Sequence, residues 1–120
     1  MLPPVDILAY GEPMVEFNQT GQGDGRLYLQ GYGGDSSNFA IAAARQGARV
    51  GYFSALGDDA HGRMLRALWE AEAVDHSSVK TDAAAFTAIY FVTHGERGHA
   101  FHFYRSGSAA SRLQPADVPR

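Results

Sequence analysis

The chain has 120 residues, contains no cysteine and carries only a small excess of negative charge, with a formal net charge of −3 at pH 7. The lack of cysteine excludes disulfide bonds and thiolate metal ligands, and it fits a reducing compartment. The lack of a basic excess removes the electrostatic footprint that nucleic-acid binding requires. We therefore expect neither a disulfide-stabilised secreted domain nor a nucleic-acid-binding protein.

Long hydrophobic runs are missing as well. No apolar segment approaches the roughly 20 residues that a membrane-spanning helix needs. The first residues, 1–6, have neither the basic nor the apolar region of a secretory signal. The hydrophobic share of 45% is nevertheless ordinary for a globular protein, and the length suits one small domain. The sequence thus predicts a cytoplasmic protein without a membrane partner.

The stretch from Gly31 to Ala40 is the most informative part of the chain. Three of its first four residues are glycines, which allow close approaches that a Cβ would block. Asp35 or Ser36 is predicted to cap a helix over 38–46, and Gly47 to end it in the left-handed conformation. A glycine-lined helix N-terminus suits a ligand rich in hydroxyls or negative charge, although an ordinary strand-to-helix turn would have the same sequence.

Apolar periodicity and turn residues predict the other elements. We expect strands over 5–10 and 49–55, a helix over about 60–72, a short strand over 77–80, and two hairpins, one from 14–17 and 26–32 and one from 87–94 and 99–105. The strand–helix–strand order indicates a parallel βαβ core, and the hairpins indicate a second, small antiparallel sheet.

Several segments of the chain follow one another in an order that is more specific than any one of them. The segment 33–40, followed by Gly47 and Gly57, resembles the N-terminal signature of one family, the ribokinase-like (PfkB) carbohydrate kinases. The matching segments also include Gly11-Glu12 after the first strand, the G-x-D-x-x-G pattern at 57–62, and the segments 87–90 and 104–109, which are similar to the branch that phosphorylates 2-keto-3-deoxygluconate.

The resemblance implies an α/β fold that begins a ribokinase-like parallel βαβ core, over about 5–11 and 33–80. A small antiparallel β lid would come from about 14–32 and 87–105. Family members are longer, and their C-terminal half carries the G-x-G-D segment with the catalytic aspartate and most of the ATP site. That segment is missing from residues 1–120. We therefore expect these residues to be the N-terminal, sugar-binding portion of a single kinase domain, with no catalytic residue of its own.

The resemblance also implies which residues contact the substrate: Gly33, Gly34, Asp35, Asn38, Tyr90, Phe103, Arg105 and Glu12. Gly34 would offer backbone where a side chain would collide with the ligand, and Glu12 would lie near the pocket floor. Phe103 stands where a tyrosine is common. Arg105 could hold a carboxylate with two parallel hydrogen bonds, which fructose or ribose would not require. A solvated lid arginine is the alternative.

The function that follows is ATP-dependent phosphorylation of a small sugar or sugar acid, with 2-keto-3-deoxygluconate converted to its 6-phosphate as the leading case. ATP and Mg²⁺ are implied as cofactors, and a homodimer or larger assembly through the lid sheet is implied as well. A fructokinase or ribokinase type remains an alternative. So does a non-catalytic sugar-binding or dimerisation module, should these residues form the whole product. A nucleotide-binding Rossmann domain is the weakest reading, because the glycines lack the G-x-G-x-x-G spacing.

Two further groups could suggest chemistry. His94, His99 and His102 could suggest a metal site, but His99 and His102 would point to opposite faces of a strand. We expect no metal site there. Asp58 and Asp59 could suggest paired acid–base carboxylates, but adjacent acids before a helix are more often caps.

Overall fold

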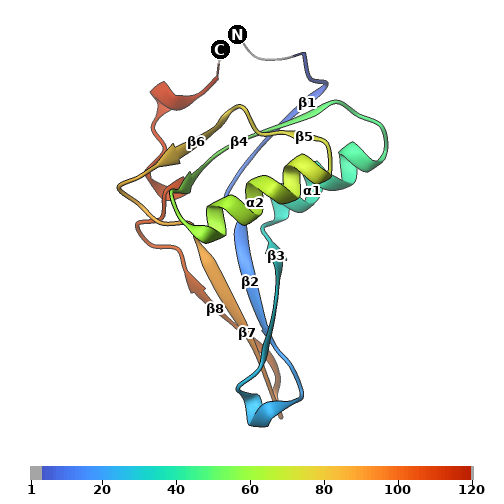
Figure 1. The fold of residues 1–120 in the computed structure, drawn as a ribbon, viewed down its shortest axis with the longest axis vertical. Coiled ribbons are helices and arrows are strands. Elements are labelled where there is room, and N and C mark those ends of the chain that lie inside the picture. Colours follow the sequence, from blue (N-terminus) through green and yellow to red (C-terminus); the bar gives the residue numbers. More distant parts are fainter. Residues whose placement is uncertain (1–3, 120) are drawn as a thin grey trace.

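The computed structural model describes residues 4–119, which form two sheets and two helices (Figure 1). The first sheet contains β1 (Ile7–Tyr10), β4 (Val50–Gly57), β5 (Val74–Asp75) and β6 (Val79–Asp82). The second, here called the lid sheet, contains β2 (Met14–Gln19), β3 (Tyr28–Gly33), β7 (Ile89–Gly95) and β8 (Gly98–Tyr104). The helices are α1 (Asp35–Arg45) and α2 (Ala60–Ala71), and the single turns are η1 (Gly23–Gly25), η2 (Ala110–Arg112) and η3 (Pro115–Asp117).

The first sheet is parallel, with β4 at its centre between β1 on one side and β5 and β6 on the other. Both helices pack against one face of it, as Figure 1 shows. Tyr52 of β4 and Trp69 of α2 meet there, with ring centroids 5.0 Å apart. The Trp69 indole donates a hydrogen bond of 2.9 Å to Ser37 of α1, so the buried layer joins both helices and the sheet.

The lid sheet extends from this core as a long arm, which gives the molecule extents of 50 × 34 × 23 Å (Figure 1). The two expected hairpins form, β2 with β3 and β7 with β8. They join through β2 and β7, which run parallel, with Val15 opposite Ile89. The lid is therefore antiparallel within each hairpin and parallel between them, because the first strand of each hairpin leaves the core in the same direction.

Several element boundaries differ from the expectation. α1 begins at Asp35, three residues before the predicted helix, and neither Asp35 nor Ser36 caps it. Gly34 holds the cap position with a φ of 100°, and no side chain completes the cap. The short strand predicted over 77–80 lies at Val79–Asp82, and β5 was not predicted. Gly47 has a φ of 97°, which confirms the predicted left-handed helix end.

The prediction that an aspartate caps α2 is confirmed. Asp59 accepts a hydrogen bond of 2.8 Å from the Gly62 N–H, while Asp58 pairs with Arg63 at the surface. Within residues 4–119, no helix is both long and apolar enough to cross a membrane. Residues 1–6, which are not expected to form a secretory signal, lie partly outside the described residues.

Candidate functional site

A cavity of about 490 Å³ lies where the lid sheet meets the end of β1 and the start of α1. The core contributes backbone and polar groups, and the lid contributes mainly apolar and aromatic side chains. The lining residues are Tyr10, Gly11, Glu12, Gly34, Asp35 and Ser36 from the core and Met14, Tyr90, Phe101, Phe103 and Arg105 from the lid. The cavity has the size of a small-molecule site.

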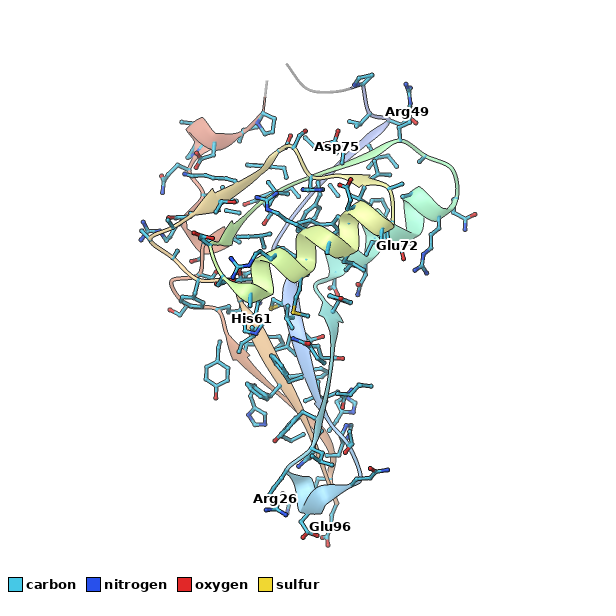
Figure 2. The ribbon with its side chains drawn as sticks, in the orientation of Figure 1. Arg26, Arg49, His61, Glu72, Asp75 and Glu96 are labelled. Carbon is cyan, nitrogen blue, oxygen red and sulfur yellow. The ribbon has the colours of Figure 1, made fainter. Side chains whose placement is uncertain are left out.

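Helix α2 contacts the opposite face of the lid sheet. Figure 2 shows His61 at the end of α2 that is nearest the lid, and its ring meets Phe17 edge-on with centroids 5.7 Å apart. Phe17 and Glu16 are neighbours in β2, so their side chains point to opposite faces. The lid therefore has one face toward α2 and one face toward the cavity.

Gly33 and Gly34 are required by contacts within the protein. A Cβ on Gly34 would lie 2.6 Å from the Glu12 carbonyl oxygen, and its φ of +100° already disfavours other residues. A Cβ on Gly33 would lie 2.2 Å from the Tyr90 hydroxyl oxygen. The two glycines thus let the helix N-terminus approach the loop after β1 and let the Tyr90 ring lie over the chain.

Glu12 connects the core to the end of the lid sheet. One carboxylate oxygen lies 2.9 Å from Nε of Arg105, and the other accepts a hydrogen bond from the hydroxyl of buried Ser108. The Arg105 guanidinium carbon is 5.9 Å from the centroid of the Phe103 ring, within reach of a cation–π attraction. Arg105 is therefore held from two sides.

Tyr90 presents an oxygen with fixed hydrogen-bonding character. Its hydroxyl donates a hydrogen bond of 3.0 Å to Glu16. Burial, together with Glu16 and Asp35, raises the pKa of Tyr90 to about 12, so the side chain stays neutral over the physiological range. Because its proton already points to Glu16, the hydroxyl can only accept a hydrogen bond from a ligand in the cavity.

The predicted site residues are brought together only in part. Glu12, Gly34, Asp35, Tyr90, Phe103 and Arg105 line the cavity, and Gly33 lies beneath Tyr90. Asp35 is exposed in the first turn of α1, where the helix dipole favours a negative charge. Asn38 is exposed and is not part of the lining, and its backbone N–H bonds to the Gly34 carbonyl at 3.0 Å.

Sequence reasoning did not find several residues at this site. Glu16 and Phe101 could have been found, because each lies two residues from a lining residue of the same strand and so shares its face. Ser36 had been considered only as a cap. It makes a hydrogen bond of 2.7 Å with Tyr52, and burial raises the pKa of Tyr52 to about 12. Ser108 lies in the matching segment 104–109, but its contact with Glu12 could not be predicted from neighbouring residues.

The G-x-D-x-x-G segment lies outside the cavity lining and has a connecting role. Asp59 accepts hydrogen bonds from both the N–H and the hydroxyl of Thr87, at 2.9 and 2.7 Å. Thr87 in turn accepts from the Gly57 N–H at 3.0 Å. Burial opposes ionisation of Asp59, but the bonds from Thr87 and Gly62 outweigh it and lower the pKa of that carboxyl. This segment thus joins the start of α2 to the start of β7.

The cavity offers acceptors at one end, the Tyr90 oxygen and the Asp35 carboxylate, and one cationic donor, Arg105. This arrangement suits a small hydroxyl-rich ligand that can also carry an anionic group. Among residues 4–119, no cluster of His, Asp and Glu is placed to hold a metal ion.

A glycine-lined helix N-terminus beside a cavity under a small β-sheet defines an α/β protein with room for a small molecule. The pfkB family of carbohydrate kinases matches residues 6–119, and the chain belongs to this family.

Named relatives fall into more than one group. The chain is 37% identical over 120 residues to a 2-dehydro-3-deoxygluconokinase from Thermoproteus tenax, and 38% identical over 119 residues to Fructokinase-1 from Oryza sativa subsp. japonica. These alignments cover 95% and 93% of this chain but only 37% and 36% of the relatives.

Solved structures show the same fold. The crystal structure of a PfkB protein from Polaromonas sp. JS666 matches 97% of this chain and 40% of that chain, with a TM-score of 0.90 and 34% identity. A fructokinase from Xylella fastidiosa with bound ATP matches 94% of this chain and 34% of that chain, with a TM-score of 0.87 and 28% identity. The chain thus has a ribokinase-like fold over its own length and spans between about a third and two fifths of these proteins.

Proposed function

We propose that this chain supplies the sugar site and lid of an ATP-dependent kinase that converts 2-keto-3-deoxygluconate to its 6-phosphate. The observation that carries the proposal is Arg105, which places a guanidinium at a cavity whose other polar groups suit hydroxyls. A guanidinium can bind the carboxylate of a sugar acid through charge-assisted hydrogen bonds. The similarity to the Thermoproteus tenax relative supports the same acceptor.

The roles we propose for the chain are binding, orientation and exclusion of water. Asp35 and the Tyr90 oxygen accept hydrogen bonds from sugar hydroxyls, Arg105 holds the carboxylate, and Phe101 and Phe103 cover the sugar from the lid. Gly33 and Gly34 allow this packing, while Asn38 acts from outside the lining. Phosphoryl transfer also requires a base and positive charge around the transferred phosphate.

The described residues do not fit a nucleotide site. Arg105 is the cationic side chain that lines the cavity, it is paired with Glu12, and residues 4–119 hold no cluster suited to a metal ion. The proposed kinase reaction therefore uses ATP and Mg²⁺, but we assign no residue of this chain to bind either of them. When bound, ATP would supply the phosphoryl group and Mg²⁺ would neutralise its charge.

A fructokinase-type activity is the second candidate. Because Glu12 balances the charge of Arg105, the cavity can also accommodate a neutral sugar. The similarity to the rice fructokinase supports this candidate. We further propose that a second copy of the chain covers the exposed side chains of Leu29 and Phe101, which lie on the two outer strands of the lid at its cavity face. We also propose that the protein is cytoplasmic.

The test is ADP release by the intact polypeptide with 2-keto-3-deoxygluconate, fructose or ribose as acceptor. We expect release with the keto acid, and release only with a neutral sugar would move the assignment to a sister branch. In calorimetry, Arg105→Ala should weaken binding of the keto acid by about 1.5–3 kcal/mol, as expected for a charge-assisted hydrogen bond. Unchanged affinity would exclude the carboxylate role.

Arg112→Ala is the matched control. Arg112 is 54% exposed and pairs with Asp82 through Nε, much as Arg105 is 53% exposed and pairs with Glu12 through Nε. The control removes the same charge from a site that does not line the cavity, so keto-acid affinity should stay at the wild-type value.

A further inference from the structure

We propose that Glu12 is a positioning and specificity-determining residue that acts through Arg105. It fixes the guanidinium and balances its charge, and so it limits how strongly the cavity prefers an acidic sugar over a neutral one. The specificity part rests on the proposed function, whereas the positioning part can be tested without any ligand.

Both carboxylate oxygens of Glu12 already have protein partners. Arg105 binds one at 2.9 Å, and the Ser108 hydroxyl donates to the other. The Glu12 side chain is only 13% exposed, and the Ser108 loop is itself fixed by hydrogen bonds between Ser108 and Ser111. Glu12 is therefore better placed to hold this loop and Arg105 than to bind sugar hydroxyls directly.

The contact with Glu12 determines which part of Arg105 remains for a ligand. Nε lies 2.9 Å from a Glu12 carboxylate oxygen, and the guanidinium carbon lies 5.9 Å from the Phe103 ring centroid. The two terminal amino groups carry the remaining N–H donors of the guanidinium. These paired donors can bind a planar carboxylate through two hydrogen bonds, so the contact with Glu12 leaves this edge of Arg105 available.

The charge of Glu12 works against an acidic ligand at the same place. A second cavity, of about 460 Å³, shares Tyr10, Gly11, Glu12 and Arg105 with the first, so the ion pair stands between two spaces that a ligand could enter. A sugar carboxylate bound to Arg105 would lie close to the Glu12 carboxylate. Like charges at short range disfavour one another, so Glu12 reduces the advantage of an acid over a neutral sugar.

The substitution Glu12→Gln removes the negative charge of this side chain while keeping its size and its contacts. The glutamine carbonyl can keep the contact with Arg105 Nε, and its amide can donate to the Ser108 hydroxyl once that hydroxyl rotates. Calorimetry with 2-keto-3-deoxygluconate and with fructose on the intact polypeptide gives the ratio of the two affinities. We expect the substitution to raise this ratio about threefold in favour of the acid, a size typical of a partly exposed charge pair.

Two control variants test whether a change in this affinity ratio comes from the charge of Glu12 acting beside Arg105. Glu72→Gln neutralises another paired carboxylate, 20% exposed and bound to Arg45 at the C-terminal end of α2, far from the lid (Figure 2), and it should leave the ratio unchanged. In an Arg105→Ala background, Glu12→Gln should raise the ratio by less than in the wild-type background, because no guanidinium then holds the acid beside Glu12. A ratio that stays constant or falls in the wild-type background, or that rises equally without Arg105, would contradict the specificity role.

Positioning has its own measurement. The Nε–H signal of Arg105, assigned by its loss in Arg105→Lys, should exchange with solvent about threefold faster in Glu12→Ala, because the carboxylate that lies 2.9 Å from Nε is removed and a partly exposed ion pair is lost. Equal exchange rates would overturn the positioning role. If the wild type binds neither sugar, the proposed function and the specificity role fail together, while the exchange result still decides whether Glu12 holds Arg105.

Discussion

Strands β4 and β8 lie at the two extremes of solvent exposure among the strands of the described residues. Every residue of β4 is buried, whereas every residue of β8 is exposed. Both segments are rich in β-branched or aromatic residues, and both were predicted as strands. β propensity thus identified the strands, but it did not distinguish a strand buried in the core from one whose side chains stay exposed.

The reason for the difference is the layer that each sheet packs against. α1 and α2 cover one face of the parallel sheet, and their side chains join its residues in one buried cluster. The lid sheet joins this cluster near its junction with the core, through Val15, Phe17 and Ile89, and it contacts α2 through Phe17 with His61 and Gln30 with Met64. The core sheet should therefore dominate stability, and the lid sheet should dominate recognition.

The largest expected effect is on the core side of this comparison. Trp69→Ala removes a fully buried side chain and its hydrogen bond to Ser37, and it should lower the free energy of unfolding by about 3–5 kcal/mol. The lid counterpart, Phe101→Ala, removes a ring that is 51% exposed and should cost far less. Urea denaturation of both variants measures the difference. Equal losses would show that the lid contributes to stability as the core does.

The next effect concerns the junction of the two sheets. Gly34→Ala should destabilise the fold by about 3 kcal/mol, because the new Cβ meets the Glu12 carbonyl and the backbone conformation disfavours alanine. Gly47 has a similar φ of +97°, but nothing lies within 4 Å of its added Cβ. Gly47→Ala should therefore cost only about 1–2 kcal/mol. If calorimetry shows a loss of sugar binding in Gly34→Ala but not in Gly47→Ala, the close packing of Gly34 against Glu12 is needed for the sugar site.

The smallest effect depends on pH. Because the pKa of Asp59 is lowered in the folded state, its contribution is fully present above the unfolded pKa of about 3.9 and is lost as the pH falls through the lower folded value. The stability of the wild type against thermal unfolding should fall as the pH decreases through this acidic range. Asp59→Asn should show a flatter dependence there and a loss of about 1 kcal/mol near neutral pH. Asp58→Asn, which alters the adjacent surface acid, should keep the wild-type slope.

The sequence predicted what depends on local order. The strand periodicities, the cap at Asp59 and the left-handed Gly47 follow from neighbouring residues and were confirmed. The parallel pairing of β2 with β7 was not predicted, because it joins segments that are distant in the chain.

The site shows the same limit. Local signals could have identified Glu16 and Phe101, but the contact between Glu12 and Ser108 joins residues 96 positions apart. The predicted cap at Asp35 was wrong because Gly34 reaches the cap position through a close approach to the loop after β1, which no local pattern reveals.

The parallel pairing of β2 with β7 has a consequence for the order of folding. The two strands can align only after the chain between them, which contains both helices and the remaining strands of the parallel sheet, has become compact. Closing so long a loop in an unfolded chain carries a large entropic cost, and contacts of this kind form slowly. The parallel core should therefore assemble first, and the cavity, which needs residues from both ends of that loop, should form last.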